Sequence, residues 1–163
     1  MHYISTRGFG PVNFETTVLD GLAPDGGLYV PTSYPKLSRE ELDELSFLSY
    51  EDMADKIMSP FIGDSIPSDV LSNIIKTAYS KFNDIEVTPV VQYEENLWLM
   101  ELFHGPTFAF KDVAMQFLGP VLEYTLGQKG QTATVIGATS GDTGPAAIEG
   151  LKNSENINVF MLY

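Results

Sequence analysis

Residues 132–151, TATVIGATSGDTGPAAIEGL, place a strand pattern, a glycine-rich turn and a helix pattern in direct succession. A second helix pattern precedes this stretch at residues 112–128, and a second apolar strand pattern, INVFMLY, follows it at residues 157–163. Alternating strands and helices with short loops are typical of a parallel or mixed sheet. We therefore predict an α/β fold for the second half of the chain.

The first half combines short strand patterns with helix patterns. HYIST and GLYV are the expected strands, and they lie among Asp-Gly and Pro-Asp-Gly-Gly turns. Ser38, followed three residues later by Glu41, predicts a capping box at the start of a helix. Two further helix patterns follow, and TPVVQY and LWLMELF then predict a hairpin around EEN. We expect a mixed strand and helix domain at residues 1–87 and an α/β domain at residues 88–163.

Composition and charge exclude several classes of function. The chain has 163 residues, of which 44% are hydrophobic and 19% charged, as in globular proteins. Its net charge of -13 disfavours binding to nucleic acid or to anionic membranes. No apolar run approaches the roughly 20 residues that cross a bilayer, and the first residues do not resemble a signal peptide. The absence of cysteine suits a cytoplasmic protein, which is the location that we expect.

Lys111 lies in ELFHGPTFAFKD, residues 101–112, with no other lysine or arginine between Lys81 and Lys129. Phe108 and Phe110 flank it, and Asp112 falls in the first turn of the next helix. An amine held beside aromatic rings and a helix N-terminus is disfavoured as the cation, which suits Schiff-base chemistry with an aldehyde. The alternative is a lysine that extends to solvent from a buried stem.

The glycine-rich turn GATSGDTG, residues 137–144, is the second candidate site. Backbone N–H groups at a helix N-terminus bind carboxylates or phosphates, and Ser140 and Thr143 add hydroxyl donors. The turn matches neither a Walker loop nor a dinucleotide fingerprint, and a tight turn that binds nothing is the alternative.

With only two histidines we expect no multi-histidine metal site. We expect His104 to form hydrogen bonds within its loop and Trp98 to lie in the core.

ELFHGPTFAFKD and GATSGDTGPAA together resemble the threonine synthase family, pyridoxal-phosphate enzymes with the tryptophan-synthase-β-like fold, or fold type II. YISTRG and GLAPDGGLYVP also resemble the N-terminal region of that family. The resemblance extends over essentially the whole chain. Two separate motifs in the family's order and spacing make it far more specific than a lone FKD.

The resemblance implies a reaction and a role for each matching residue. The family is a carbon–oxygen lyase of threonine biosynthesis that converts O-phospho-L-homoserine and water into L-threonine and phosphate. Lys111 matches the catalytic lysine that forms a Schiff base with pyridoxal 5'-phosphate. Asp142 matches a position at the edge of the cofactor ring, and Ser140 and Thr143 match the loop that faces the substrate carboxylate.

The resemblance covers only the N-terminal portion of the longer family members. It implies that residues 1–87 form a threonine-synthase-like N-terminal domain and residues 88–163 the incomplete beginning of the pyridoxal-phosphate domain. The groups for the cofactor phosphate lie in the family's C-terminal part, so we expect this chain to be a fragment, inactive alone, whose partner is that missing part. A related dehydratase or β-replacement lyase, and a non-catalytic truncated module, are the alternatives.

Overall fold

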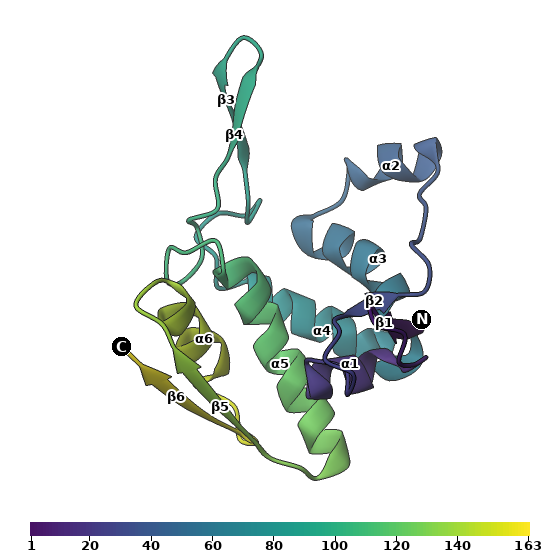
Figure 1. The fold of residues 1–163 in the computed structure, drawn as a ribbon. Helices are drawn as coiled ribbons and strands as arrows, with labels where there is room; N and C mark the ends of the chain where they lie inside the picture. The colour runs from purple at the N-terminus through teal and green to yellow at the C-terminus, as the bar shows by residue number, and fades with distance from the viewer. The chain divides into compact units, whose positions relative to one another are not determined.

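The computed structural model describes residues 1–163, which divide into two compact units, Met1–Asn73 and Ile74–Tyr163. Figure 1 labels the helices and strands of both units. Each unit mixes helices with strands, so the expected combination of the two kinds of element is present in both halves of the chain. None of the helices has the length and apolar character needed to cross a bilayer.

The first unit contains a short antiparallel strand pair and four helical segments, and it also holds the start of α4. The elements are β1 (Tyr3–Ser5), α1 (Phe14–Asp20), β2 (Tyr29–Pro31), α2 (Arg39–Leu45), α3 (Tyr50–Ile62), the 3-10 helix η1 (Gly63–Ser65) and α4 (Ser68–Tyr79). In the strand pair, Ile4 lies opposite Val30. Both predicted strands and the three predicted helices are therefore confirmed. Helix α1 is an addition to them.

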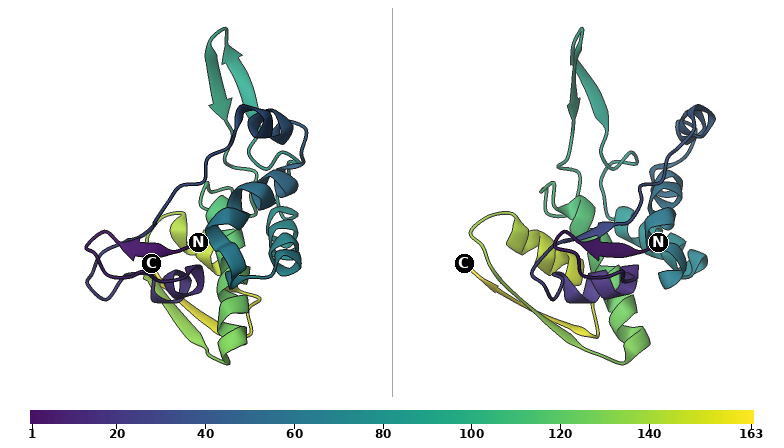
Figure 2. Two further views of the ribbon diagram at one scale, coloured as in Figure 1. Left: turned by 90° about the vertical axis from the view of Figure 1, so that its right-hand side faces the viewer. Right: turned by 45° about the vertical axis from the view of Figure 1, so that its right-hand side comes forward.

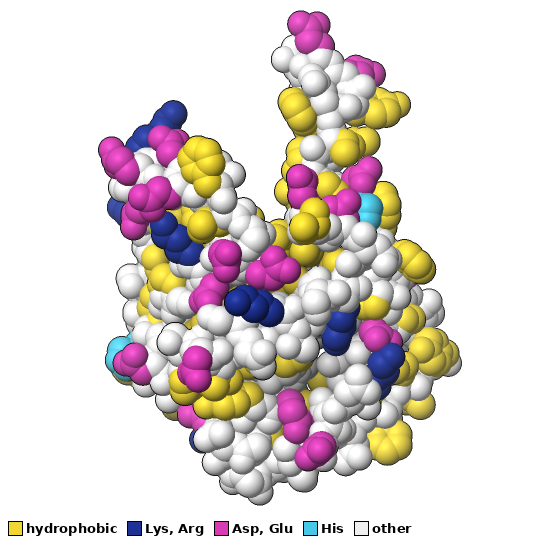
Figure 3. All heavy atoms as spheres, turned by 180° about the vertical axis from the view of Figure 1, so that it is seen from behind, with side chains coloured by type: hydrophobic (Ala, Val, Ile, Leu, Met, Phe, Trp, Pro, Cys, Tyr) yellow, Lys and Arg dark blue, Asp and Glu magenta, His cyan; other side chains and the backbone are white.

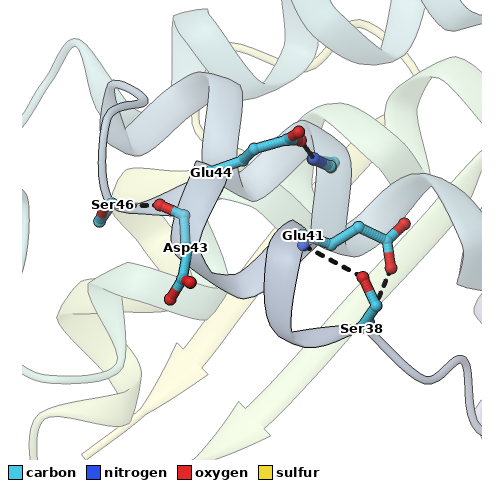
Figure 4. A network of polar contacts seen from close by, with 6 residues as sticks. Ser38, Glu41, Asp43, Glu44 and Ser46 are labelled. Atoms are coloured by element: carbon cyan, nitrogen blue, oxygen red, sulfur yellow. Dashed lines mark hydrogen bonds and ion pairs between the residues drawn. The ribbon is translucent and has the colours of Figure 1, made fainter.

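Helix α2 begins with the predicted capping box, which Figure 4 shows from close by. The Ser38 hydroxyl accepts a hydrogen bond from the Glu41 N–H at 3.2 Å, and the Glu41 carboxylate accepts one from the Ser38 N–H at 2.7 Å. Glu44, one turn later, pairs with Lys56 of α3 at 3.0 Å. Because this pair is largely exposed, it adds little to stability, and the cap is the feature that defines where α2 begins.

Asp25 joins the two N-terminal segments, YISTRG and APDGG. Its carboxylate accepts hydrogen bonds from the Ser5 hydroxyl at 2.7 Å and from the N–H groups of Gly27 and Phe9, both at 3.0 Å. The hydrogen bond from Ser5 is the main cause that lowers the pKa of Asp25 below its ordinary value of 3.8. A Cβ at position 27 would overlap the Ser5 hydroxyl, so this junction requires glycine there.

The second unit contains a hairpin followed by a helix–strand–helix–strand succession. Its elements after α4 are β3 (Val90–Glu94), β4 (Leu97–Met100), α5 (Asp112–Lys129), β5 (Ala133–Ala138), α6 (Thr143–Leu151) and β6 (Ile157–Leu162). Strands β3 and β4 are antiparallel, whereas β5 and β6 are parallel and run in register from Ala133 opposite Ile157 to Ala138 opposite Leu162. The predicted hairpin and the predicted parallel sheet are both confirmed.

The β3–β4 hairpin is apolar and yet exposed along its whole length. Trp98 is 55% exposed and Tyr93 is 66% exposed, so the expectation that Trp98 lies in the core is wrong for this chain. The two strands pair only with each other, and both views of Figure 2 show them standing apart from α5 and α6. Figure 3 shows apolar side chains along the hairpin. An apolar strand pair without a covering layer leaves its aromatic side chains in solvent.

Helices α5 and α6 meet through glycine backbone. A Cβ at Gly119 of α5 would overlap the carbonyl oxygen of Gly150 in α6, and a Cβ at Gly150 would lie 2.5 Å from the carbonyl oxygen of Met115. Backbone atoms cannot move aside as flexible side-chain ends do. The close contact between these two helices therefore depends on the absence of side chains at positions 119 and 150.

We predict that Asp25→Asn destabilises the chain at neutral pH and that this difference shrinks in acid. Because the folded-state pKa of Asp25 is lowered, its contribution is present above the unfolded value of 3.8 and is lost as the pH falls through the folded value. Urea unfolding at several pH values between 7 and 3 measures the difference. Asp64→Asn, at an exposed position of η1, is the control without effect. A difference that widens in acid would contradict the prediction.

We predict that Gly119→Ala costs about 1–3 kcal/mol of unfolding free energy, the usual cost of overfilling a packed contact. Gly127→Ala, in the same helix, is the matched control, because a Cβ there would meet only the Asn156 side chain at 3.6 Å. That control should be neutral or stabilise by up to about 1 kcal/mol, since alanine favours helices over glycine. Urea unfolding of both variants measures the effect, and equal changes would refute the role of the helix contact.

Candidate functional site

The N-termini of α5 and α6 lie at the same end of the second unit. Gly119 and Gly150 are each the eighth residue of their helices, and the two helices touch there. At a rise of 1.5 Å per residue, each helix begins about 10 Å before this contact. Figure 1 shows both helices starting at the end where β5 finishes. The loops that precede α5 and α6 therefore share one end of the unit.

Lys111 is the residue immediately before α5, with helical backbone angles of φ -65° and ψ -20°. Its side chain is half-buried and makes no capping hydrogen bond and no ion pair. The Nζ atom lies 5.0 Å from the centroid of the Phe110 ring, so the predicted aromatic neighbour is present. Phe108, the second predicted neighbour, is 70% exposed. Lys111 thus offers an amine that no carboxylate neutralises.

Asp112 follows Lys111 and is fully buried, with 0% exposure. Its two oxygens accept hydrogen bonds from Thr107, one from the N–H at 2.7 Å and one from the hydroxyl at 2.8 Å. The prediction that Asp112 lies in the first helical turn is confirmed. Its pairing with Thr107 was not predicted, although a threonine five residues before a helix-starting carboxylate could have suggested a closed loop.

The glycine-rich turn connects β5, which ends at Ala138, to α6, which begins at Thr143, as predicted. The Thr139 hydroxyl accepts a hydrogen bond from the Gly141 N–H at 3.2 Å. Ser140 and Asp142 are exposed, and Asp142 stands before α6 without capping it through its side chain. The hydroxyl of Ser140 and the carboxylate of Asp142 have no hydrogen-bond partner within the chain, so both are open to a ligand.

The structure brings the predicted residues to one end of the unit without linking them directly. No hydrogen bond or ion pair joins Lys111 to Ser140, Asp142 or Thr143. A molecule that used both loops would itself have to bridge them. The roles of these four residues stay predictions.

Sequence reasoning missed the surroundings of Gln116, one helical turn beyond Asp112. Gln116 is fully buried. Its Oε1 accepts a hydrogen bond from the Lys81 amine at 2.9 Å, while its Nε2 has no partner.

His104 pairs with Glu101 at 2.7 Å, and the His104 carbonyl accepts a hydrogen bond from the Asn83 N–H at 2.9 Å. The expectation that His104 forms hydrogen bonds within its loop is confirmed.

Comparison with known proteins gives one consistent answer. The family model described as "Threonine synthase N terminus" matches residues 2–79. Threonine synthases of Pseudomonas aeruginosa and Saccharomyces cerevisiae are 45% and 47% identical to this chain and are matched over 100% and 99% of its length. A protein of Pongo abelii named "Threonine synthase-like 2" is 41% identical over 99% of the chain.

Solved structures agree with this result. A pyridoxal-phosphate-bound threonine synthase from Brucella melitensis covers 99% of the chain with a TM-score of 0.96 and 46% identity. The threonine synthase of Escherichia coli covers 100% of it with a TM-score of 0.87 and 35% identity. The chain spans 35% and 37% of these two structures, and about a third of the curated relatives.

These matches first define the class: the chain has the mixed α/β fold of the N-terminal part of a fold type II enzyme, as predicted. More particularly, residues 2–79 match the N-terminal model of the threonine synthase family, and the whole chain is similar to the N-terminal third of threonine synthases.

Proposed function

We propose that this chain contributes the cofactor-binding lysine to a threonine synthase. The reaction is the conversion of O-phospho-L-homoserine and water into L-threonine and phosphate by a carbon–oxygen lyase that uses pyridoxal 5'-phosphate. The observation that carries the proposal is the position of Lys111, an unpaired amine at the end of the unit that also holds the 139–143 loop. The identity of 45% to a threonine synthase along the whole chain supports it.

The surroundings of Lys111 fit an aldehyde cofactor. The amine is half-buried beside Phe110 and has no carboxylate partner, so it is available to form a covalent bond with an aldehyde. When bound, pyridoxal 5'-phosphate supplies an electron sink that makes protons next to the amino group of the substrate removable. Lys111 would hold the cofactor, and its Nζ would carry protons to and from the substrate.

The 139–143 loop fits a negatively charged group of the substrate. The first N–H groups of α6 have no partner within their own helix and carry a partial positive charge. We assign Ser140 and Thr143, which lie at this helix start, to the substrate carboxylate, and Asp142 to the edge of the cofactor ring. These local donors are needed because the chain as a whole has a net charge of -13, which repels anions.

None of the candidate site residues in this chain is assigned to the phosphate group of the cofactor. We assign them to a further segment corresponding to the rest of the relatives, which are about three times as long. That segment is the partner that we propose for the chain, and the exposed hairpin is consistent with it. We also propose that the two domains span residues 1–87 and 88–163. We further propose a cytoplasmic location, which the absence of cysteine suits.

The test is to attach the cofactor and locate it. The protein encoded by the complete reading frame is incubated with pyridoxal 5'-phosphate, reduced with borohydride and digested, and the labelled peptide is identified by mass spectrometry. We expect the label on Lys111 and a loss of at least about 90% of it in Lys111→Arg, because the guanidinium of arginine forms no such bond. Lys129→Arg, at the other end of α5, is the matched control and should label normally. Labelling of a different lysine would refute the assignment.

Turnover separates the proposed reaction from its alternatives. Release of phosphate from O-phosphohomoserine by the complete protein supports threonine synthase. Formation of a 2-oxo acid from serine or threonine would instead indicate the related dehydratase, and exchange of a β-substituent would indicate a replacement lyase. Labelling of Lys111 without turnover of any of these substrates would favour the non-catalytic module.

A further inference from the structure

We propose that Asp112 is a positioning residue that acts through Thr107 to fix the loop from which Lys111 presents its amine. This inference rests on the proposed role of Lys111 as the cofactor lysine. We call the two hydrogen bonds between Asp112 and Thr107 the Asp112 clamp.

The clamp is buried and uses both carboxylate oxygens. Asp112 has 0% exposure, and its oxygens accept from the Thr107 N–H at 2.7 Å and from the Thr107 hydroxyl at 2.8 Å. Hydrogen bonds to an ionised acceptor are short and roughly twice as strong as neutral ones. Water cannot replace a partner that is lost at a fully buried carboxylate, so the clamp holds the loop more firmly than an exposed pair would.

The loop that the clamp closes is tight, and its backbone conformation has to be stabilised by contacts with other residues. A Cβ at Gly105 would lie 2.5 Å from Oδ2 of Asp112, so the carboxylate occupies the space that any other residue at 105 would fill. Phe108 closes the turn by donating its N–H to the Gly105 carbonyl at 3.1 Å, and it does so with φ at +60°. A phenylalanine in this left-handed region is unfavourable unless its surroundings hold it there.

Lys111 lies inside the loop that the clamp closes, directly before Asp112, the first residue of α5, so its backbone is fixed from both sides. On the helix side, its carbonyl accepts hydrogen bonds from the N–H groups of Ala114 at 3.2 Å and Met115 at 2.9 Å. On the loop side, the clamp ties the preceding segment to Asp112. Both Asp112 oxygens are occupied by Thr107, and no ion pair joins Asp112 to the Lys111 amine. The carboxylate therefore positions the lysine without neutralising it.

The experiment uses the complete protein and four variants. Thr107→Val removes one hydrogen bond with little change in volume, and Thr107→Ser keeps the hydroxyl as the conservative rescue. Asp112→Asn replaces one of the two acceptor oxygens. Glu123→Gln is the matched control, because Glu123 of α5 also accepts two hydrogen bonds, from the N–H of Asn156 at 3.0 Å and from its side-chain amide at 2.7 Å.

Two quantities are measured for each protein. The first is hydrogen exchange at the backbone amide of residue 107 without cofactor, relative to the intrinsic rate of the residue present. The second is the rate of borohydride-trapped attachment of pyridoxal 5'-phosphate at Lys111. We expect Thr107→Val and Asp112→Asn to accelerate the exchange and to slow the attachment, each on the order of tenfold. Thr107→Ser and Glu123→Gln should remain within about twofold of the unchanged protein in both measurements.

The results separate the positioning role of Asp112 from the proposed function of Lys111. Attachment rates of Thr107→Val and Asp112→Asn equal to that of the unchanged protein would overturn the inference while leaving the proposed function intact. Equal slowing in Glu123→Gln would also overturn it, because general stability would then explain the effect. If the unchanged protein does not attach the cofactor at Lys111, the proposed function fails and the positioning role falls with it.

Discussion

Backbone contact between Gly119 of α5 and Gly150 of α6 determines the geometry of the second unit. Only two residues without side chains allow the helices to approach so closely, and each glycine lies seven residues after the first residue of its helix. Because α5 and α6 also run in the same direction (Figure 1), the contact brings the starts of both helices to one end of the unit. The parallel pairing of β5 and β6 also fixes the direction of α6. Because both strands run the same way, α6 must start where β5 ends and lead the chain back to the end where β5 begins, so that β6 can start there.

Two loops then place different chemistry at that end. The loop before α5 is held by the Asp112 clamp and ends in the amine of Lys111. In the loop before α6, the side chains of Ser140 and Asp142 have no hydrogen-bond partner in the chain. One loop thus offers an amine, and the other offers the Ser140 hydroxyl as a donor and the Asp142 carboxylate as an acceptor. Under the proposed function, an acidic chain would bind an anionic substrate in this way, because donors at a helix start act over a short range while the net charge is screened by salt.

Local patterns predicted much of the fold and less of the site. The capping box of α2, the β3–β4 hairpin and the succession from α5 to β6 all follow from residue spacing and turn residues. Helix α1 could have been predicted as well, since Asn13 caps its start and Gly21 follows its end. The exposure of Trp98 could not, because the apolar pattern of a strand does not reveal whether anything covers it.

The site shows the same division between local and tertiary information. The positions of Lys111 and the 139–143 loop at helix starts follow from motif and period. The burial of Asp112 and of Gln116 depends on the packing of α5 against its neighbours, which spacing along the chain does not specify. Family resemblance adds roles for residues, whereas the geometry shows how the loop before α5 is held in place.

A crystal structure of the complete protein, solved after borohydride reduction with pyridoxal 5'-phosphate and with a substrate analogue bound, tests most directly whether the two loops form one site. We predict continuous electron density from Nζ of Lys111 into the cofactor, and hydrogen bonds from the Ser140 or Thr143 hydroxyl to the carboxylate of the analogue. Density on another lysine, or an analogue bound without any contact to residues 139–143, would contradict this account.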